Sequence, residues 1–319
     1  MKVLVTGGCG YVGGATVDAL QQAGHDVRVY DVLLYEEQYR KDVDFIRGDV
    51  RDTERLTEHL AWADCVIWLA ALVGDGACGL LPDVTVELNQ KTVEWLRANF
   101  DGRIVFASTC SVYGAQDGEL DESSALNPLS LYAATKVKAE EYLHDSNAIV
   151  FRLGTLFGVG DAFSRIRLDL VVNALTARAH ERGAISVFGG DQFRPLLHVK
   201  DAGGAFARAA DQTATGIYNL TMRNMRIIDI AYYVRGHFPD LKIETTEAMF
   251  QDTRNYRVSA QKAAKEIGYR SQWSLDDGIE EIKKLVMEGR IRDTGLDRYS
   301  NHAYLKALLA REGDALVFR

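Results

Sequence analysis

Short apolar runs alternate with longer stretches of mixed polarity through the first half of the 319-residue chain. Several runs are apolar at consecutive positions, as in strands that helices cover on both faces. The runs predict strands at 2–7, 26–32, 43–50, 63–72, 103–109 and 148–158. Apolar positions three and four residues apart predict helices between them, near 12–23, 53–61, 84–99 and 131–145. Strands that alternate with helices favour an α/β fold with a doubly wound parallel sheet, whose strand carboxyl ends share one ligand-binding edge.

The second half of the chain is less regular. It predicts strands at 185–190 and 216–220, and helices near 166–182, 201–210, 227–237, 259–267 and 275–289. We therefore expect a sheet domain over 1–165, a smaller, mostly helical lobe over 166–300, and a helical tail over 301–319. Part of the segment 196–232 is expected to return to the first domain.

The charge balance limits the partners that the chain can have. The formal net charge is −8 and the isoelectric point is about 5.5. Such a chain repels nucleic acid and anionic membrane surfaces, so neither is expected as a partner. The sequence contains no run of 18 apolar residues, and its first residues do not resemble a secretion signal. We expect a cytoplasmic protein without a membrane span.

Cysteine and histidine give no sign of a metal site or a disulfide framework. The four cysteines, at 9, 65, 78 and 110, form no CxxC pair. We expect reduced thiols that pack as small apolar residues. The seven histidines show no HExxH motif and no other ligand spacing, so the sequence predicts no metal.

Gly7, Gly10 and Gly13 follow the first predicted strand and open the first predicted helix. Glycines at this spacing let a backbone approach a ligand closely, and the N–H groups at a helix start attract a pyrophosphate. Glycine loops also form ordinary turns. The flanking strand and helix favour a dinucleotide-binding loop.

Asp31 ends the second predicted strand, 18 residues after Gly13. A carboxylate at about this distance accepts hydrogen bonds from an adenosine ribose and repels a 2′-phosphate. The spacing therefore favours NAD over NADP, with an ordinary strand-end aspartate as the alternative. The ends of the third and fourth strands lie at the same edge, where they can line the cofactor: Asp49, Val50, Leu69, Ala70 and Ala71.

Tyr132 and Lys136 lie four residues apart in LYAATK, on one face of a predicted helix. Thr109 ends the fifth predicted strand, so all three side chains can meet at the nicotinamide end of a dinucleotide. An ammonium group favours the phenolate of a tyrosine, whose ordinary pKa is about 10. Such a tyrosine can take the proton of a sugar hydroxyl while hydride leaves the same carbon for the cofactor. We predict that the three are catalytic; the alternative is a packed tyrosine and a solvated lysine.

Taken together, the motifs resemble those of the extended short-chain dehydrogenases/reductases, and among these the nucleotide-sugar epimerases and dehydratases. The resemblance covers almost the whole chain and rests on TGGCGYVGG, Asp31, GDVRD, LAAL, STCSVYG, YAATK, RLGTLFG and VFGGDQFRPLLHVKDAGGAF. It implies a Rossmann fold, NAD as cofactor, a nucleotide-diphosphate sugar as substrate, and a homodimer through helices 84–99 and 131–145. The first domain would then bind NAD, and the second lobe would bind the nucleotide-sugar.

The resemblance also implies roles for single residues. Tyr11 and Val12 would join the three glycines around the pyrophosphate, while Ala70 and Ala71 would lie along the cofactor. Arg194, in QFRPLLHVKD, is similar to the family's arginine for the nucleotide-sugar, and Arg254 would be a second. Each of these arginines could instead be an ordinary surface residue. Asn89 matches the family's asparagine before a helix, or is simply a helix residue.

Three positions depart from the family pattern. The 4,6-dehydratases carry an Asp-Glu pair after the catalytic threonine, whereas this chain has Cys110 and Ser111. Thr155 stands where many members have asparagine against the sugar-nucleotide phosphate. We place Cys110, Ser111 and Thr155 at the substrate, with packing as the alternative for the thiol. The segment 160–173 adds Asn173 as a substrate contact, and Arg165 and Arg167 either line this site or are solvated.

These departures disfavour the elimination of water. The remaining chemistry is oxidation of the sugar at C4 without elimination, and an epimerase that returns hydride to the other face is the leading prediction. A 4-dehydrogenase that releases the keto sugar, epimerisation beside the keto group, and a dehydratase or decarboxylase relative stay open. A non-catalytic, NAD-sensing protein is disfavoured because the Thr-Tyr-Lys set is intact.

Overall fold

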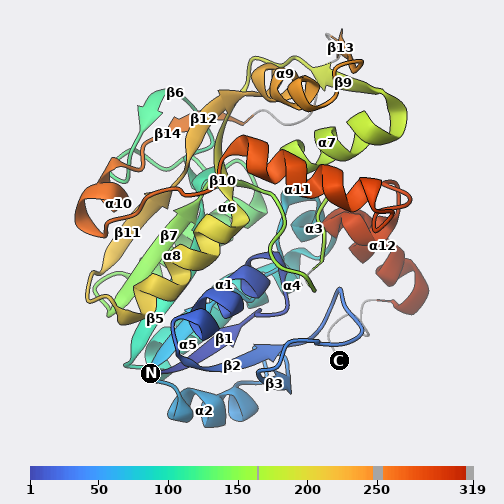
Figure 1. The fold of residues 1–319 in the computed structure, drawn as a ribbon. Helices are drawn as coiled ribbons and strands as arrows, with labels where there is room; N and C mark the ends of the chain where they lie inside the picture. Colours follow the sequence, from blue (N-terminus) through green and yellow to red (C-terminus); the bar gives the residue numbers. More distant parts are fainter. Residues whose placement is uncertain (164, 247–253, 314–319) are drawn as a thin grey trace.

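The computed structural model describes residues 1–163, 165–246 and 254–313 (Figure 1). Its main feature is a sheet of seven strands in the order β11-β7-β5-β4-β1-β2-β3, with every neighbouring pair parallel. This confirms the α/β fold with a doubly wound sheet. The strands are β1 (Lys2–Thr6), β2 (Asp26–Asp31), β3 (Asp44–Arg47), β4 (Cys65–Trp68), β5 (Arg103–Thr109), β7 (Ala148–Leu153) and β11 (Gly216–Leu220).

Helices cover both faces of this sheet. On one face α1 (Tyr11–Gln22) packs beside α8 (Val199–Asp211), as the blue and yellow helices of Figure 1 show. The other face carries α2 (Thr53–Trp62), α5 (Thr92–Asn99) and α6 (Leu131–Leu143). The apolar run of β1 explains this arrangement, because its alternate side chains enter the two separate cores on the two faces.

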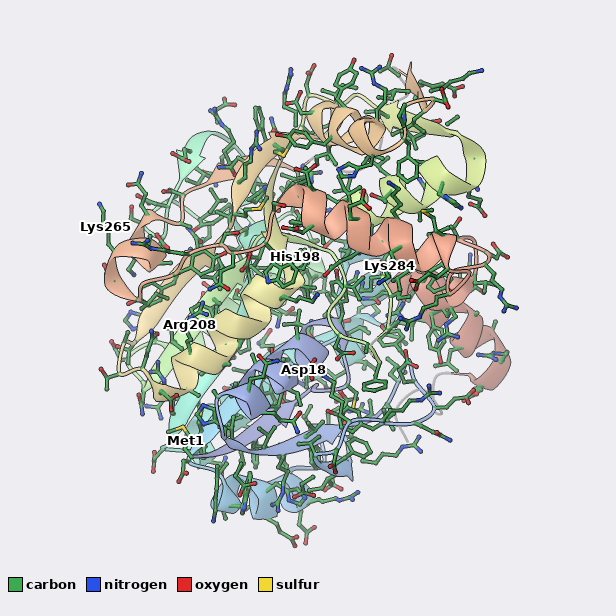
Figure 2. All side chains as sticks on the ribbon, in the orientation of Figure 1. Met1, Asp18, His198, Arg208, Lys265 and Lys284 are labelled. Carbon is green, nitrogen blue, oxygen red and sulfur yellow. The ribbon has the colours of Figure 1, made fainter. Side chains whose placement is uncertain are left out.

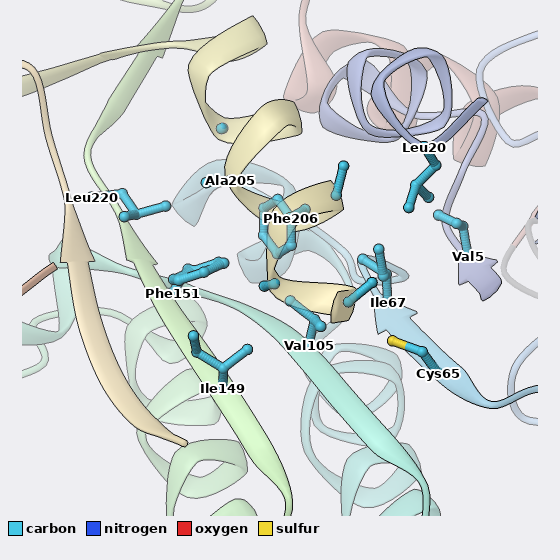
Figure 3. Packing of buried hydrophobic residues seen from close by; sticks show 14 of the residues in the cluster. Val5, Leu20, Cys65, Ile67, Val105, Ile149, Phe151, Ala205, Phe206 and Leu220 are labelled. Carbon is cyan, nitrogen blue, oxygen red and sulfur yellow. The ribbon is translucent and has the colours of Figure 1, made fainter. Parts of the chain in front are cut away.

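The core under α1 and α8 is drawn in Figure 3. Phe151 of β7 and Phe206 of α8 meet edge to face with ring centroids 5.3 Å apart. The two helices approach closely because α8 has a glycine at the contact. A Cβ on Gly203 would lie 2.6 Å from the backbone carbonyl carbon of Ala15.

The second lobe packs a core of its own around helices α7 and α9. Part of the chain from this half returns to the large sheet, since β11 pairs with β7. The main helices of the lobe are α7 (Val171–Arg182), α9 (Ile227–His237) and α11 (Leu275–Met287).

In the part of the chain that the structure describes, seven strands form small sheets outside the large one. Five of them were not predicted from the sequence: β6, β10, β12, β13 and β14. Strand β9, which was predicted, pairs with β13; β10 lies between β8 and β12; and β6 pairs with β14. These small-sheet strands are β6 (Ala115–Leu120), β8 (Thr155–Phe157), β9 (Ala184–Phe188), β10 (Phe193–His198), β12 (Arg223–Arg226), β13 (Lys242–Thr246) and β14 (Asn255–Val258).

Several predicted boundaries were wrong. The strand predicted over 148–158 is broken at Gly154, where a Cβ would lie 2.7 Å from the carbonyl oxygen of Pro195. The chain leaves the large sheet there, and β8 pairs with β10 instead. The strand predicted at 63–72 ends at Trp68, and the helix predicted from 166 begins at Val171.

The helix predicted at 84–99 has an irregular middle. It consists of α4 (Pro82–Val86), one π-helical turn η1 (Glu87–Lys91) and α5. The π-turn carries Asn89, whose side chain accepts a hydrogen bond from the backbone nitrogen of Leu72 at 2.8 Å. Asn89 thereby fixes the segment that follows β4, at the ligand-binding edge of the sheet.

The last helix, α12, lies against α3. It ends within the predicted tail, of which residues 314–319 lie outside the described residues. The remaining helices are α3 (Asp75–Leu80), η2 (Cys110–Tyr113), α10 (Gln261–Glu266), η3 (Asp297–Tyr299) and α12 (Asn301–Glu312). Among the described residues, no helix is both long and apolar enough to cross a membrane.

Candidate active site

One elongated cavity of about 1660 Å³ follows the carboxyl ends of the parallel strands. Residues after β1, β2, β4, β5 and β7 line one side, and α7 and β9 of the second lobe line the other. An open parallel sheet binds its ligands at this edge. Of the predicted site residues, those that line the cavity are Gly7, Gly10, Tyr11, Val12, Gly13, Asp31, Asp49, Val50, Leu69, Ala70, Ala71, Thr109, Ser111, Tyr132, Lys136, Thr155, Arg194 and Arg254.

The glycine loop has two kinds of glycine. Gly7 has a φ of +75°, and its Cβ would lie 2.6 Å from the backbone nitrogen of Ala70. A Cβ on Gly13 would lie 2.4 Å from the carbonyl oxygen of Gly7. These two glycines therefore allow protein backbone to pack against protein backbone.

Gly10 is different because it faces the cavity. Its Cβ would meet only the carbonyl oxygen of Gly7, at 3.2 Å. Gly10 is also the N-cap of α1, and no side chain caps this helix. The first N–H groups of α1 are thus available to an anionic ligand, and this end of the cavity fits the pyrophosphate of a dinucleotide.

Asp31 is held in one orientation where the cavity passes the end of β2. Its carboxylate accepts hydrogen bonds from the backbone nitrogens of Cys9, at 3.0 Å, and Leu33, at 2.8 Å. Burial raises the pKa of Asp31 above its ordinary value, and these hydrogen bonds only partly oppose that shift. Asp49 is fixed as well, because both of its carboxylate oxygens accept hydrogen bonds from the Arg51 guanidinium. A fixed acceptor beside an uncapped helix start fits the ribose of a dinucleotide.

Thr109, Tyr132 and Lys136 meet in the middle of the cavity. Helix α6 begins just before the tyrosine, because the Ser130 hydroxyl accepts a hydrogen bond from the backbone nitrogen of Ala133 at 3.2 Å. The side chains of Tyr132 and Thr109 are close enough to influence each other, and both line the cavity. One turn further along α6, the ammonium of Lys136 donates a hydrogen bond of 2.8 Å to the carbonyl oxygen of Ala107 in β5.

Burial changes the proton affinities of this group. It lowers the pKa of Lys136 from 10.5 to about 8. Burial also raises the pKa of Tyr132, as does the negative charge of Asp75, while the positive charge of Arg167 lowers it. The phenol therefore needs further positive charge beside it to act as a base near neutral pH.

A buried ion pair holds α6 against the sheet. The Glu140 carboxylate accepts hydrogen bonds from the Arg152 guanidinium of β7, the shortest of them 2.6 Å, and from the Ser108 hydroxyl of β5. Arg152 also donates to the hydroxyl of Tyr113 at 2.8 Å. Ser108 is adjacent to Thr109, so the network ties the helix that carries Tyr132 to the strand that carries Thr109.

Arginines surround the far end of the cavity. Arg194, in β10, donates a hydrogen bond of 2.6 Å to the carbonyl oxygen of Arg254. The Arg254 guanidinium donates to the hydroxyl of Ser111 at 3.4 Å and pairs with Asp75 at 3.4 Å. Guanidinium groups at this end fit the phosphates of a second ligand.

Two predicted substrate contacts do not reach the cavity. Cys110 is fully buried among apolar side chains, where its thiol donates to the carbonyl oxygen of Arg152, 3.3 Å away. Asn173 is fully buried too and accepts a hydrogen bond from the backbone nitrogen of Gly158 at 2.9 Å. Because both side chains point into the protein interior, neither is kept as a substrate contact.

The buried asparagine helps to join the glycine loop to the second lobe. The hydroxyl of Tyr11 donates to the carbonyl oxygen of Gly158 at 2.6 Å, and Asn173 holds the same residue from α7. The next backbone nitrogen, of Val159, donates to Glu281 of α11 at 2.8 Å. Glu281 also binds His198, which Figure 2 labels at the start of α8.

Several residues of the cavity escaped the sequence analysis. Asp75 and Ser130 lie beside Tyr132, and Arg178 and Arg182 of α7 line the far end. For Asp75, the available signal was its position shortly after β4, at the ligand-binding edge. Arg165 and Arg167, for which two alternatives were open, both line the cavity.

Arg165 connects the cavity wall to the C-terminal segment. Its guanidinium donates to the carbonyl oxygen of Arg298 at 2.7 Å and to the side chain of Asn301, and lies 3.9 Å from the ring centroid of Tyr35. Residues 300–302 consequently form part of the cavity wall. Within the described ranges, no cluster of three or more His, Cys, Asp or Glu side chains could hold a metal ion.

Comparison with known proteins identifies relatives along most of the chain. The sequence matches the model of the NAD dependent epimerase/dehydratase family over residues 3–221. It is 30% identical over 242 residues to a UDP-glucose 4-epimerase of Rhizobium meliloti, which covers 67% of this chain and 74% of that protein. It is 28% identical over 312 residues to the low-salt glycan biosynthesis protein Agl12 of Haloferax volcanii, which covers 88% and 96%.

Solved structures share the fold. A UDP-glucose 4-epimerase of Thermotoga maritima, crystallised with UDP-glucose, superposes with a TM-score of 0.79 at 20% identity, over 91% of this chain and 100% of that chain. An NAD dependent NDP-hexosamine 5,6-dehydratase of tunicamycin biosynthesis superposes with a TM-score of 0.80 at 23% identity, over 92% and 99%. At these identities the likeness concerns the fold alone.

Proposed function

Because the chain belongs to the NAD dependent epimerase/dehydratase family, we propose that it is a nucleotide-sugar epimerase that works through a 4-keto sugar. The family is NAD dependent, so NAD is the cofactor. One observation carries the proposal: Thr109, Tyr132 and Lys136 line the same cavity as the glycine loop and the arginines of the second lobe. Relatives named UDP-glucose 4-epimerases support the same activity.

The residues present fit NAD. The uncapped start of α1 would hold the pyrophosphate, Asp31 the adenosine ribose, and Lys136 the nicotinamide ribose. Asp49, Val50 and the segment 69–71 would flank the rest of the molecule. When bound, NAD would supply a hydride acceptor and a positively charged ring.

Tyr132 would act as the base at the C4 hydroxyl of the sugar. Lys136 places a positive charge one helical turn away, which favours the phenolate. The Lys136 ammonium is already positioned by its hydrogen bond to Ala107. Thr109 would hydrogen-bond the reacting oxygen and pass the proton to and from Tyr132. The keto sugar would then rotate in the cavity and present its other face. Tyr132 would return the proton to the oxygen on C4.

The far end of the cavity would hold the diphosphate of the substrate. Arg194 supplies a guanidinium group there, Arg254 lies between Arg194 and the catalytic group, and Thr155 and Ser111 line the same space. An anionic diphosphate matches this charge. Nucleotide-diphosphate sugars are therefore the substrate class that we propose.

Elimination of water is disfavoured because the position for a second acid holds no carboxyl group. Cys110 is buried away from the cavity, and Ser111, which does line it, is a weak acid and a weak base. This observation ranks the epimerase ahead of a dehydratase.

The proposal is tested on a panel of UDP-, dTDP-, GDP- and CDP-sugars incubated with enzyme and NAD, with products followed by chromatography and mass spectrometry. We expect a product of unchanged mass with one nucleobase, and no product with Tyr132→Phe, which should still bind NAD. Tyr232→Phe, exposed on α9 and outside the cavity lining, is the matched control. A product two mass units lighter would indicate a dehydrogenase, and one lighter by a water would indicate a dehydratase; either would contradict the proposal.

The enzyme is also proposed to be a homodimer. Helices α5 and α6 pack side by side, and the side chain of Gln90, in η1 just before α5, donates to the hydroxyl of Tyr142 in α6 at 3.3 Å. Two such pairs could form a four-helix contact. Light scattering at micromolar concentration should give twice the subunit mass of 35.4 kDa, and a single subunit mass would contradict the dimer. The four free thiols fit a reducing compartment such as the cytoplasm.

A further inference from the structure

Asp75 brings a carboxylate to the reacting end of the cavity. It is the first residue of α3, lines the cavity, and its side chain is 38% exposed. The Ser130 hydroxyl donates a hydrogen bond of 2.7 Å to the Asp75 carboxylate. Since Ser130 is two residues before Tyr132, this contact places Asp75 beside the catalytic tyrosine.

A second contact places Asp75 on the substrate side of that tyrosine. The Arg254 guanidinium lies 3.4 Å from the other carboxylate oxygen of Asp75 and 3.4 Å from the hydroxyl of Ser111. Ser111 in turn follows Thr109 by two residues, and its backbone nitrogen donates to the threonine oxygen at 3.1 Å. Asp75 and Arg254 thus span the space in front of the Thr109–Tyr132 pair.

The other carboxylates of the cavity have different surroundings. Asp31 ends β2, Asp49 follows β3, and Asp169 is paired with Arg167 at 2.9 Å. Glu36 lies 4.0 Å from Arg298, and Glu244 belongs to β13 of the second lobe. Asp75 also disfavours the phenolate of Tyr132 through its negative charge, as expected for a neighbouring carboxylate. Asp75 is therefore the carboxylate that a sugar held at Tyr132 would meet.

We propose that Asp75 makes this sugar site select a neutral hexose over the corresponding hexuronic acid. The inference rests on the proposed function. With the C4 hydroxyl at Tyr132, the neighbouring substituents of the sugar, at C3 and C6, lie next to the contacts of Asp75. A hydroxyl there donates a hydrogen bond to the carboxylate, whereas a 6-carboxylate would meet a like charge.

Arg254 would otherwise favour the acidic sugar. A guanidinium binds a carboxylate well, but here Asp75 already compensates its charge. Removing the charge of Asp75 should therefore remove a repulsion of the 6-carboxylate. This argues against the decarboxylating alternative, whose substrate is a uronic acid.

The test compares binding of two ligands that differ only at C6. For the nucleobase that the panel identifies, dissociation constants are measured by calorimetry for the neutral hexose and for its 6-carboxylate, with NAD present. The Tyr132→Phe background prevents turnover. Asp75→Asn keeps an oxygen that can accept from Ser130, and Asp75→Ser is a second variant. Asp83→Asn removes the same charge from an exposed position in α4, outside the cavity lining, and is the control.

We expect the protein with Asp75 to favour the neutral sugar, and Asp75→Asn to shift the ratio of the two dissociation constants toward the uronic acid by about tenfold or more. Asp83→Asn should leave the ratio unchanged. An unchanged ratio in both Asp75 variants, or a preference of the parent protein for the uronic acid, would overturn the inference alone. Binding of neither sugar by the parent protein would overturn the proposed function, and the inference with it.

Discussion

Gly7→Ala and Gly10→Ala should fail in different ways, although both add one methyl group to the same loop. Gly7 has a φ of +75°, and its Cβ would lie 2.6 Å from the backbone nitrogen of Ala70. Gly10 has a φ of −78°, and its Cβ would meet only one carbonyl oxygen, at 3.2 Å. The first methyl collides with the protein itself, whereas the second occupies the cavity at the start of α1.

The magnitudes follow from these geometries. A left-handed conformation costs a non-glycine residue roughly 1–2 kcal/mol, and overpacking against rigid backbone adds about 1–3 kcal/mol. Gly7→Ala should therefore lower the free energy of unfolding by about 3 kcal/mol. Gly10→Ala carries no left-handed strain and should stay within about 1 kcal/mol of the parent protein. Its methyl takes the place of a phosphate oxygen, so NAD affinity should fall about tenfold or more.

The assay combines urea unfolding of the NAD-free protein with calorimetric titration of NAD. Gly24→Ala is the control, because Gly24 has a φ of +79° with no atom near its Cβ and so isolates the backbone strain. A Gly7→Ala protein as stable as Gly24→Ala would refute the packing argument. A Gly10→Ala protein that binds NAD as tightly as the parent would refute the pyrophosphate site.

Three further predictions concern the interior and the assembly. Burial lowers the pKa of Lys136 from 10.5 to about 8, so the unfolded state binds the extra proton between these values and stability should rise with pH across this interval. The shift corresponds to about 3 kcal/mol. Burial raises the pKa of the four thiols in both proteins, which lowers stability alike in both at alkaline pH. Urea unfolding at pH 7 and pH 10 should therefore show the difference in unfolding free energy between the parent and Lys136→Met moving in favour of the parent by about 2–3 kcal/mol, and an unchanged difference would contradict the prediction. Glu140→Gln leaves the buried Arg152 charge uncompensated and should cost about 3 kcal/mol or more of unfolding free energy in the same assay, with Glu141→Gln, exposed on the same helix, as control. Dilution that converts the proposed homodimer to a monomer should lower the activity in parallel, because α6 carries Tyr132 and forms the proposed contact; light scattering and turnover are measured on the same samples, and full activity in the monomer would contradict this coupling.

The sequence predicted those parts of the site whose residues lie close together along the chain. The glycine loop, Asp31 and the Tyr132–Lys136 pair each lie within or next to one strand or helix, where spacing along the chain determines proximity. Their place on the cavity follows from the parallel sheet, which brings successive strand ends together. The doubly wound fold was predictable for the same reason.

The remaining features depend on contacts between distant segments. In the sequence, nothing distinguishes Asp75 from an ordinary surface aspartate. Its place in the site follows from its contact with Arg254 of the second lobe. Cys110 is next to a catalytic residue in sequence, yet the short helix after β5 turns its thiol into the core. The break of the strand at Gly154 follows from the carbonyl oxygen of Pro195, which belongs to a strand of another sheet. No local pattern reports such contacts.

The most direct test of the central claim follows one deuterium atom. A nucleotide-sugar substrate labelled with deuterium at C4 is incubated with the enzyme and excess unlabelled NAD, and the product is examined by mass spectrometry and NMR. The account predicts an epimer that keeps its deuterium at C4, because the hydrogen is removed and returned within one cavity. Release of the deuterium into NADH free in solution would contradict it. So would a product that NMR shows to be inverted at a carbon other than C4.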